Sequence, residues 1–398
     1  MSEAATHSKG AVLGGALLYC AGGLMFVFTP AFLGDMQERF GLSPADLGTL
    51  SAVELWAIAL ASFLGPFWIT RVSWRTLVRF GAAAALAGQV ASLFVANFHM
   101  LMLVRMATGL FGEGVLLALS YSTLGQTRNV ERSFSLAYGA SIVIGMIGLY
   151  ASPELNRALG TVSVLVVLAG AAGAAFLSAS LLPDGPVKQS FAPVTRDRKR
   201  PASVWRSLGA VALLTQAIWY AGAGGFWSFT EQLASMRGIG TRDIAHAMGI
   251  GTAAALVGSM LALFLNGRFG RTIPIALSTV LAAVSIVAFM GSTETFFVVV
   301  ELASFNVFWA SGTIYVTAAT CAFDEEGNIA VLVPAFQVAG MAVGTAVLGH
   351  TIERFGPIST PWTVMGFFGA SLVLLFLFQT RAARSRRQEE RARVIEMS

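Results

Sequence analysis

The sequence predicts an all-α membrane protein that crosses the bilayer about twelve times, and three observations support this fold class. Of its 398 residues, 56% are hydrophobic and only 12% are charged, whereas soluble domains carry about 25% charged residues. The mean hydropathy is +0.71. The apolar residues also form continuous runs that are long enough, as helices, to cross a hydrocarbon core of about 30 Å. A soluble domain could bury only part of this apolar surface, so we expect lipid to surround it.

Each predicted span is one of these apolar runs. Helices are favoured over a membrane barrel, because a helix satisfies its own backbone hydrogen bonds in lipid and the runs lack the alternation of membrane strands. The run that starts at Ala11 is too long for a secretory signal, so it is expected to be the first membrane helix. The predicted spans are 11–34, 47–69, 76–97, 99–123, 133–152, 160–183, 207–229, 243–266, 272–291, 295–322, 328–349 and 358–380.

A basic, proline-containing segment at 184–206 divides the chain into two sets of six spans. This division predicts a six-helix bundle in 1–183, a cytoplasmic linker at 184–206, a second six-helix bundle in 207–380 and a basic cytoplasmic tail at 381–398. The two predicted bundles have similar lengths, which is typical of an internal repeat.

Short matches between the halves, at an offset of 197 residues, support that repeat. Gly41, Leu42 and Asp46 correspond to Gly238, Ile239 and Asp243, and Arg71 corresponds to Arg268. Within the first copy, the sequence Ser43-Pro44-x-Asp46 predicts an N-cap, a first-turn proline and a capping-box acid that begin the second helix.

The basic residues predict the orientation. Twenty of the 26 lysines and arginines fall in segments on one side of the predicted spans and five on the other, while Arg105 lies inside a span. Lysine and arginine accumulate on the cytoplasmic side of membrane proteins. We therefore expect both termini in the cytoplasm and the chain in the cytoplasmic membrane.

The sequence contains no motif for a metal, a cofactor or a nucleic acid. Cys20 and Cys321 both lie in apolar segments, and the histidines are scattered, with His246 and His350 at span ends, where we interpret them as bystanders. No nucleotide-binding loop of the GxxxxGK[ST] type is present. The net charge of +5 reflects short loops and the tail, so we expect no nucleic-acid partner and no cofactor.

Four charged residues stand out because they lie well inside predicted spans. A charge there costs about 2.5–3.5 kcal/mol at the centre and is a functional candidate for proton coupling or gating. Glu54, Arg105 and Glu301 are predicted about 10 Å deep, and Glu113 about 20 Å deep. Glu54 and Arg105 share a depth and can pair, either as a structural lock or as part of a gate.

Glu113 has no predicted partner at its own depth. A carboxyl group in a low-dielectric surrounding favours its neutral form, so Glu113 is a candidate to take up and release a proton. The alternative is a permanently protonated group bonded to nearby backbone. Glu301 occupies a position related to that of Arg105 by the repeat. It either forms a contact between the bundles that breaks and reforms, or is a solvated carboxylate near the outer mouth. Glu231 is interpreted as an interfacial charge.

Aromatic and polar side chains recur at helical spacing in the first, seventh and tenth spans. One interpretation is packing or an interfacial aromatic belt. The other is an aromatic-walled cavity with a few amide and hydroxyl groups, as is typical of sites for amphipathic organic ligands. The candidate cavity residues are Tyr19, Phe26, Gln216, Trp219, Tyr220, Trp227, Asn306, Trp309 and Thr313.

Several local motifs resemble those of the major facilitator superfamily. Residues 65–75, GPFWITRVSWR, are similar to the family's G-x-L-x-D-R-x-G-R-R loop after the second helix, without its acidic residue; the repeat at 267–271 is GRFGR. Arg105 with Gly109, Gly112 and Gly114 resembles the family's arginine–glycine motif in the fourth helix. Residues 139–148 are glycine-rich like the antiporter motif but lack its Gly-Pro pair.

The resemblance implies two bundles that rock about a site at the midplane, lined by the first, fourth, seventh and tenth helices. It implies cytoplasmic gate loops containing Gly65, Arg71, Arg75, Arg268, Gly270 and Arg271. The expected function is secondary active transport of a small amphipathic or aromatic organic solute by proton-coupled symport. Proton-coupled efflux by antiport is the alternative, and a non-transporting sensor of the same fold is the alternative from another class. We expect no enzymatic activity, and a monomer, because one chain can hold a complete pathway in this family.

Overall fold

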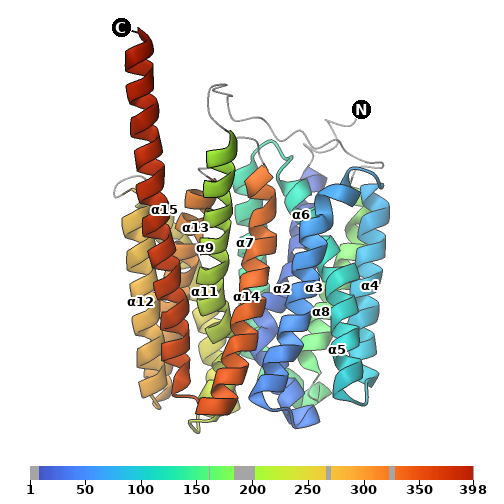
Figure 1. The fold of residues 1–398 in the computed structure, drawn as a ribbon. Helices are drawn as coiled ribbons and strands as arrows, with labels where there is room; N and C mark the ends of the chain where they lie inside the picture. The colour runs from blue at the N-terminus through green and yellow to red at the C-terminus, as the bar shows by residue number, and fades with distance from the viewer. Residues whose placement is uncertain (1–8, 161, 183–201, 266–269, 322–327, 398) are drawn as a thin grey trace.

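The computed structural model describes residues 9–160, 162–182, 202–265, 270–321 and 328–397, and these residues form helices joined by short turns, without a strand (Figure 1). The first half of the chain contains α2 (Lys9–Phe40), α3 (Pro44–Ile69), α4 (Trp74–Phe94), α5 (Phe98–Ala107), η1 (Thr108–Glu113), α6 (Gly114–Leu124), α7 (Val130–Leu159), α8 (Ser163–Leu177) and η2 (Ser178–Leu181). The second half contains α9 (Ala202–Ser228), α10 (Thr230–Ser235), α11 (Thr241–Phe264), α12 (Thr272–Gly291), α13 (Thr295–Cys321), α14 (Asn328–Phe355) and α15 (Ser359–Met397).

The helices confirm the predicted all-α membrane fold. Eleven of them are long and apolar enough to cross a membrane, with α5, η1 and α6 together forming one. The helix α9 occupies the position of the seventh predicted span and lies alongside α14 and α15 in the same bundle (Figure 1). The twelve predicted spans therefore each correspond to a helix.

Several predicted spans were shorter than the helices that contain them, because a helix can continue beyond the end of its apolar run. The helices α2, α7 and α14 continue about two turns beyond the predicted ends of their spans. The helix α15 runs on through the predicted tail to Met397, a stretch rich in alanine, arginine and glutamate, which are good helix formers. The predicted linker at 184–206 lies largely outside the described residues.

The predicted start of the second helix is confirmed in detail. Ser43 accepts a hydrogen bond from the backbone N–H of Asp46 at 3.2 Å, and the Asp46 carboxylate accepts one from the backbone N–H of Ser43 at 3.3 Å. Pro44 is the first helical residue. This reciprocal capping box satisfies two backbone donors that a helix start otherwise leaves free.

Glycines in the left-handed region of backbone space mark the repeat. Gly41 (φ 64°) and Gly238 (φ 78°) lie 197 residues apart, and Gly160 (φ 78°) and Gly356 (φ 77°) lie 196 apart. Gly41, Gly160 and Gly356 each donate a backbone hydrogen bond to the carbonyl four residues earlier. Such glycines end a helix at low cost because they have no Cβ. The same turn chemistry thus recurs at equivalent points of the two halves.

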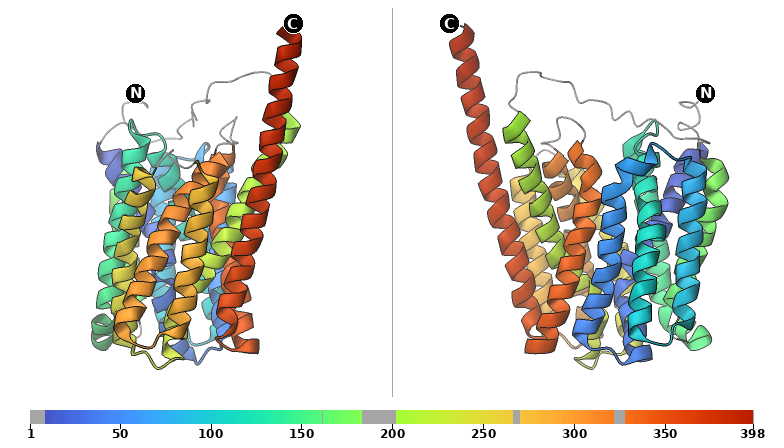
Figure 2. Two further views of the ribbon diagram at one scale, coloured as in Figure 1. Left: turned by 90° about the vertical axis from the view of Figure 1, so that its left-hand side faces the viewer. Right: turned by 45° about the vertical axis from the view of Figure 1, so that its right-hand side comes forward.

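The two halves meet through two pairs of helices. The helix α3 packs along α14, and α7 packs along α11. By the repeat, α3 and α11 are equivalent and so are α7 and α14, so the two pairs exchange under a pseudo-twofold axis. Figure 1 and both views of Figure 2 show the helices of the two halves running roughly side by side, with the start of α2 and the end of α15 toward the same end of the bundle. We call this the terminal end, and the other the far end.

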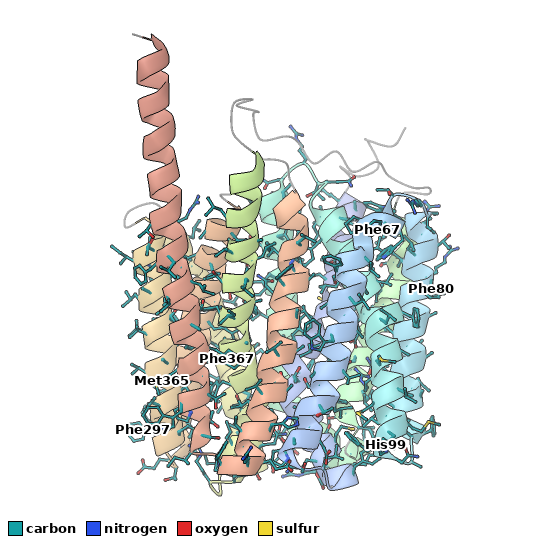
Figure 3. All side chains as sticks on the ribbon, in the orientation of Figure 1. Phe67, Phe80, His99, Phe297, Met365 and Phe367 are labelled. Carbon is teal, nitrogen blue, oxygen red and sulfur yellow. The ribbon has the colours of Figure 1, made fainter. Side chains whose placement is uncertain are left out.

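Large apolar side chains cover the outside of the bundle. Phe67 and Phe80 on the first half and Phe297 on the second are each at least 50% exposed and point outward in Figure 3. In water this surface would drive aggregation, whereas in lipid it is solvated. The outside of the protein therefore matches a membrane-embedded bundle.

Close helix contacts in the first half depend on glycine, which gives a test of the packing. A Cβ on Gly22 of α2 would lie 2.6 Å from the backbone nitrogen of Leu117 and 2.7 Å from the carbonyl oxygen of Glu113. Backbone atoms cannot yield as a side chain can, so we expect Gly22→Ala to cost about 1–3 kcal/mol. Thermal unfolding in detergent should show a lower midpoint.

The matched control is Gly170→Ala in α8. A Cβ there meets nothing within 4 Å. Alanine also favours the helix over glycine by up to about 1 kcal/mol, so the midpoint should stay or rise. Equal destabilisation by both variants would contradict the proposed packing.

Candidate functional site

Arg105 lies in the interior of the first half and forms the centre of a buried polar cluster. Its side chain is 0% exposed, and Glu54 is 1% exposed. The guanidinium Nε donates to Glu54 Oε2 at 3.0 Å, and Nη2 donates to Glu54 Oε1. The two bonds form a fork between α5 and α3, the strongest geometry for an arginine and a carboxylate. The predicted pairing of Glu54 with Arg105 is thus present.

Gln89 of α4 joins the cluster and was not singled out in the sequence. Arg105 Nη1 donates to Gln89 Oε1 at 2.7 Å, and Gln89 Nε2 donates to Glu113 Oε1 at 2.9 Å. The amide therefore connects the cation to the second carboxyl group. An amide inside an apolar span has little reason to face lipid, and this argument, used for Gln216, could have identified Gln89.

The expectation that Glu113 stands alone at its depth is wrong. Its Oε1 lies 3.5 Å from Arg105 Nη2. On a regular α-helix, residues eight apart point about 80° away from each other, because each residue turns the chain by about 100°. Residues 108–113 form a π-helix, η1, which inserts an extra residue into the turn. Glu113 therefore occupies the place of i+7, on the same face as Arg105.

The cluster leaves one carboxylate oxygen unused. Among the residues that the structure describes, Glu113 Oε2 is buried and has no hydrogen-bond partner. Both oxygens of Glu54 are bonded to the guanidinium. A buried ionised carboxylate with a bare oxygen is costly, so Glu113 is the carboxyl group better suited to its neutral form.

The surroundings of the cluster are apolar and tightly packed. Met25 Sδ lies 3.7 Å from Arg105 Nη2, and the Phe32 ring centre lies 5.0 Å from the guanidinium carbon, both from α2. A Cβ at Gly109 would lie 2.7 Å from the Glu54 carbonyl oxygen, and one at Gly112 would lie 2.7 Å from the Ala85 backbone. The arginine–glycine motif therefore lets α3 and α4 approach closely enough to enclose the charges.

The second half has no copy of this cluster. At the offset of 197, the positions of Glu54, Gln89, Arg105 and Glu113 are occupied by Gly251, Ile286, Leu302 and Ala310. The charge chemistry is thus confined to the first half, although the fold repeats.

In this conformation the described contacts of Glu301 lie in its own half, so a contact between the bundles that breaks and reforms stays a prediction. It accepts a hydrogen bond from Ser292 Oγ at 2.5 Å and interacts electrostatically with Arg237, both in its own half. Arg105 is fully engaged by Glu54 and Gln89. Similar position in the repeat therefore does not bring the two residues together.

Arg39 and Arg237 are a repeated feature that the sequence comparison missed. Arg39 donates to the carbonyls of Ser92, Leu93 and Val95 at 2.8–2.9 Å, at the end of α4. In the second half, Arg237 donates to the Phe289 carbonyl and to that of Ser292 at 2.9 Å, at the end of α12. Each arginine satisfies free helix carbonyls and complements the negative end of the helix dipole.

Contacts between the halves gather toward the far end. Trp227 Nε1 donates to the carbonyls of Phe26 and Val27 at 3.1 and 3.2 Å. Tyr150 stacks on His246 with ring centres 4.0 Å apart, so His246 is a contact residue and not the bystander we expected. These contacts join the middle of α2 to α9 and the far-end parts of α7 and α11, and they hold the two halves together.

Two carboxylates also join the halves at the far end. Glu353 of α14 accepts hydrogen bonds from Ser43 Oγ at 2.6 Å and from the Ala45 backbone N–H at 2.9 Å, at the start of α3. Glu154 of α7 lies 3.5 Å from Arg242 of α11. The far end is therefore held by hydrogen bonds and an ion pair as well as by ring contacts.

Nearer the terminal end, tyrosines from both halves come together. The rings of Tyr19 and Tyr121 lie 6.0 Å apart, and Tyr138 and Tyr220 lie near Tyr19. These residues come from α2, α6, α7 and α9. Tyr19, Tyr121 and Tyr138 are only partly buried, and the Tyr220 hydroxyl donates to Thr313 Oγ1 at 3.2 Å. Of the four, the sequence had indicated only Tyr19 and Tyr220.

The other predicted cavity residues divide between the two interpretations. Trp227 contacts Phe26 backbone at the interface, and its ring centre lies 6.1 Å from that of Trp309. Gln216 donates to Thr317 Oγ1 at 2.9 Å, and among the described residues its Oε1 has no partner.

Trp219 and Asn306 lie inside the second half, so the cavity prediction for them is wrong in this conformation. Trp219 is 0% exposed, donates to Thr279 Oγ1 at 2.9 Å and stacks on Phe368. Asn306 is buried, donates to the Leu302 carbonyl of its own helix, and its amide faces Gly251 of α11. Helical spacing places these residues on one face of their helices, but it could not show that this face packs against other helices of the second half.

The basic loop residues lie near the terminal end. Gly65 is buried against Ala118, and Arg75 Nε donates to the Leu182 carbonyl at 2.8 Å, which ties α4 to the end of the sixth span. Arg71 is exposed. In the second copy, Gly270 has a φ of 64°, Arg271 precedes α12, and Arg268 lies outside the described residues.

Residues 13–326 match the family model described as Major Facilitator Superfamily. The chain belongs to the major facilitator superfamily. It is accordingly a multi-pass membrane transporter and not an enzyme. The first-half cluster is thus the buried charge site of a superfamily transporter.

Solved structures of this superfamily fold are similar over nearly the whole chain. The nucleoside transporter NupG has a TM-score of 0.68 at 14% identity and covers 93% of this chain and 98% of its own. The peptide transporter POT in complex with sulfate has a TM-score of 0.71 at 13% identity, covering 95% of each chain. The xylose transporter XylE from E. coli, in a partially occluded inward-open conformation, has a TM-score of 0.66 at 14% identity, covering 93% and 98%. At these identities the likeness shows the fold alone.

A curated relative is the probable anion transporter 4, chloroplastic, of Oryza sativa subsp. japonica. It is 28% identical over 134 residues, 32% of this chain. The match spans 22% of that relative's length.

Arg105 gives a test of the cluster's energetics. Arg105→Met would leave the Glu54 carboxylate buried without its cation, and breaking one partner of a buried pair typically costs about 3–5 kcal/mol. We expect a sharp loss of folded protein and a lower unfolding midpoint in detergent. The double variant Arg105→Met with Glu54→Gln should recover much of that loss, because no charge is then left unpaired. Additive effects of the two changes would contradict the geometry.

Proposed function

We propose that this superfamily transporter couples the movement of a small organic solute to protons, and that Glu113 is the group that carries the proton. The observation that supports this most is the composition of the buried cluster. One guanidinium faces two carboxyl groups, and only Glu54 takes a full share of its hydrogen bonds. Electrostatic balance in a low-dielectric interior favours one proton on the remaining carboxyl group.

The cluster's location supports a coupling role as well as a structural one. Glu113 lies on η1, and π-helical turns often occur at functional sites. The Glu113 carbonyl packs against Gly22 of α2, a helix that also contacts α9 across the interface. A change in the charge of Glu113 can therefore alter the packing of α2, which belongs to both the cluster and the interface.

We infer that the far end faces outward and the terminal end faces the cytoplasm, from the distribution of basic residues. Closure of the far end then corresponds to a form of the transporter that is open to the cytoplasm. Alternation between this form and its opposite would expose the central site to the two sides in turn.

The tyrosine group supports a neutral or weakly polar aromatic solute. Tyr19, Tyr121, Tyr138 and Tyr220 offer ring faces and hydroxyl groups from both halves, near the interface. Aromatic walls with a few hydrogen-bonding groups are typical of sites for amphipathic organic ligands. Gln216, with its unused amide oxygen, adds an acceptor in the second half.

The coupling is tested with purified protein in liposomes, an imposed pH gradient and a panel of labelled aromatic solutes. Symport predicts accumulation of the solute inside the vesicles when protons flow inward. In Glu113→Gln, gradient-driven accumulation should be lost while exchange of solute at equal pH continues, because an amide cannot release a proton. The control is Glu294→Gln, an exposed carboxylate that should behave as wild type.

Two results would contradict this proposal. Gradient-driven accumulation that is unchanged in Glu113→Gln would remove the proton role of this residue. Solute movement against the direction of proton flow would replace symport by antiport, the second candidate mechanism, which the buried acids also suit.

The solute site is tested by removing single hydroxyl groups. Tyr220→Phe removes a hydrogen-bonding group at the interface, worth about 0.5–1.5 kcal/mol, so the apparent affinity should fall about two- to tenfold with expression unchanged. The matched control is Tyr315→Phe, whose hydroxyl donates to the Ala262 carbonyl inside the second half. An equal effect of both variants would show that the tyrosine group does not bind the solute.

A further inference from the structure

Two glutamates of the second half approach the first half at the far end. One meets a positively polarised helix start, and the other meets a carboxyl group. Glu353 contacts the start of α3, where the free N–H groups and the helix dipole carry positive charge. Glu231 of α10 contacts α2 beside Asp35, a carboxylate. One contact is therefore electrostatically favourable in the closed form, and the other is unfavourable.

The favourable contact is a charge-assisted cap across the interface. Glu353 Oε2 accepts from Ser43 Oγ at 2.6 Å and from the Ala45 N–H at 2.9 Å. Ser43 and Asp46 already form the capping box of α3, so Glu353 adds an anion from the other half to a completed helix start. Separation of the halves at this end must break both hydrogen bonds.

The unfavourable contact encloses the Glu231 carboxyl group near Asp35. The Glu231 carboxyl lies against the backbone of Gly34, where a Cβ would overlap its Oε1. Asp35 follows Gly34 directly in α2, so a second carboxyl group belongs to the same part of the helix. Asp35 is buried, and its Oδ1 accepts from Asn156 Nδ2 at 2.7 Å. The described part of the chain provides no hydrogen-bond or ion-pair partner for Glu231.

The arginines near this end are engaged elsewhere. Arg39 and Arg237 bind helix carbonyls of their own halves. Arg157 and Arg242 both face Glu154, and the Arg354 guanidinium carbon lies 5.3 Å from the centre of the Phe355 ring. His246 stacks on Tyr150. None of these contacts gives the Glu231 carboxyl group a cation, so the cost of enclosing it at this end is not offset by an ion pair.

We propose that Glu353 and Glu231 set the balance between the closed and open forms of the far end, with opposite signs. Glu353 stabilises the closed form by capping α3, and Glu231 destabilises it because its carboxyl group is enclosed against Gly34 without a partner. These are positioning residues of the transport cycle, separate from the buried Arg105 cluster. The inference rests on the proposed alternation between two forms, but it does not depend on Glu113 or on the identity of the solute.

The balance can be measured as a distance distribution between two spin labels in lipid nanodiscs. Ala158 at the end of α7 and Ser235 at the end of α10 are exposed residues of opposite halves at this end, and each is replaced by cysteine. Cys20 and Cys321 are replaced by serine in this background. The short-distance fraction then reports the closed form.

Glu353→Gln should lower the closed-to-open ratio, and Glu231→Gln should raise it, each by on the order of twofold to tenfold. The double variant should return close to the starting ratio. Ser43→Ala removes one of the two hydrogen bonds to Glu353 from the other half and should act in the direction of Glu353→Gln. Glu294→Gln, an exposed carboxylate near the same end, should leave the ratio unchanged.

Shifts of the same sign in the two glutamine variants, or no shift in Glu353→Gln and Ser43→Ala, would overturn the inference. Two distance populations whose ratio is the same in all of these variants would overturn the proposed roles of Glu353 and Glu231 alone. The proposed transport cycle would then still stand. A single distance in every variant and at every solute concentration would overturn both.

Discussion

The structure depends on the pairing of one guanidinium in a place that neither lipid nor water can solvate. Arg105 is buried among α2, α3 and α4, and the cost of that burial is offset only because Glu54 and Gln89 approach it in good geometry. This requirement fixes the fourth span against the second and third. It also explains the glycines at 109, 112 and 114, which keep those helices close enough for the side chains to meet.

The same requirement makes the two halves chemically different although their fold repeats. Glycine turns, arginine-capped helix ends and helix order recur in both halves. The second half carries small or apolar residues where the first carries its charges. In the proposed cycle, a proton bound in the first half acts on the interface through α2, while the second half contributes ring faces, hydroxyl groups and the glutamates of the far end.

Most of the fold could be predicted because a segment that crosses lipid must be an apolar helix, and continuous apolar runs in the sequence show where such helices lie. The capping box at Ser43 and the pairing of Glu54 with Arg105 were also predictable, since both follow from local spacing or from shared depth. The contact of Glu113 with Arg105 was missed because only depth along the helix was compared. The π-helical turn at 108–113, which brings Glu113 onto the face of Arg105, cannot be recognised from residue types. Trp219 and Asn306 were misjudged because periodicity gives a helix face but not which neighbour covers it. The residues of the tyrosine group come from four separate spans, so only the three-dimensional packing brings them together.

The central claim is that Arg105 neutralises one carboxylate of the pair and that Glu113 holds a proton. Infrared spectroscopy of the protein in lipid measures this directly, because a protonated carboxyl group has a C=O stretching band separate from that of a carboxylate. We predict such a band in the wild type, sensitive to exchange into heavy water, and its loss in Glu113→Gln but not in Glu294→Gln. A band that persists unchanged in Glu113→Gln would show that the proton resides elsewhere and would contradict the account.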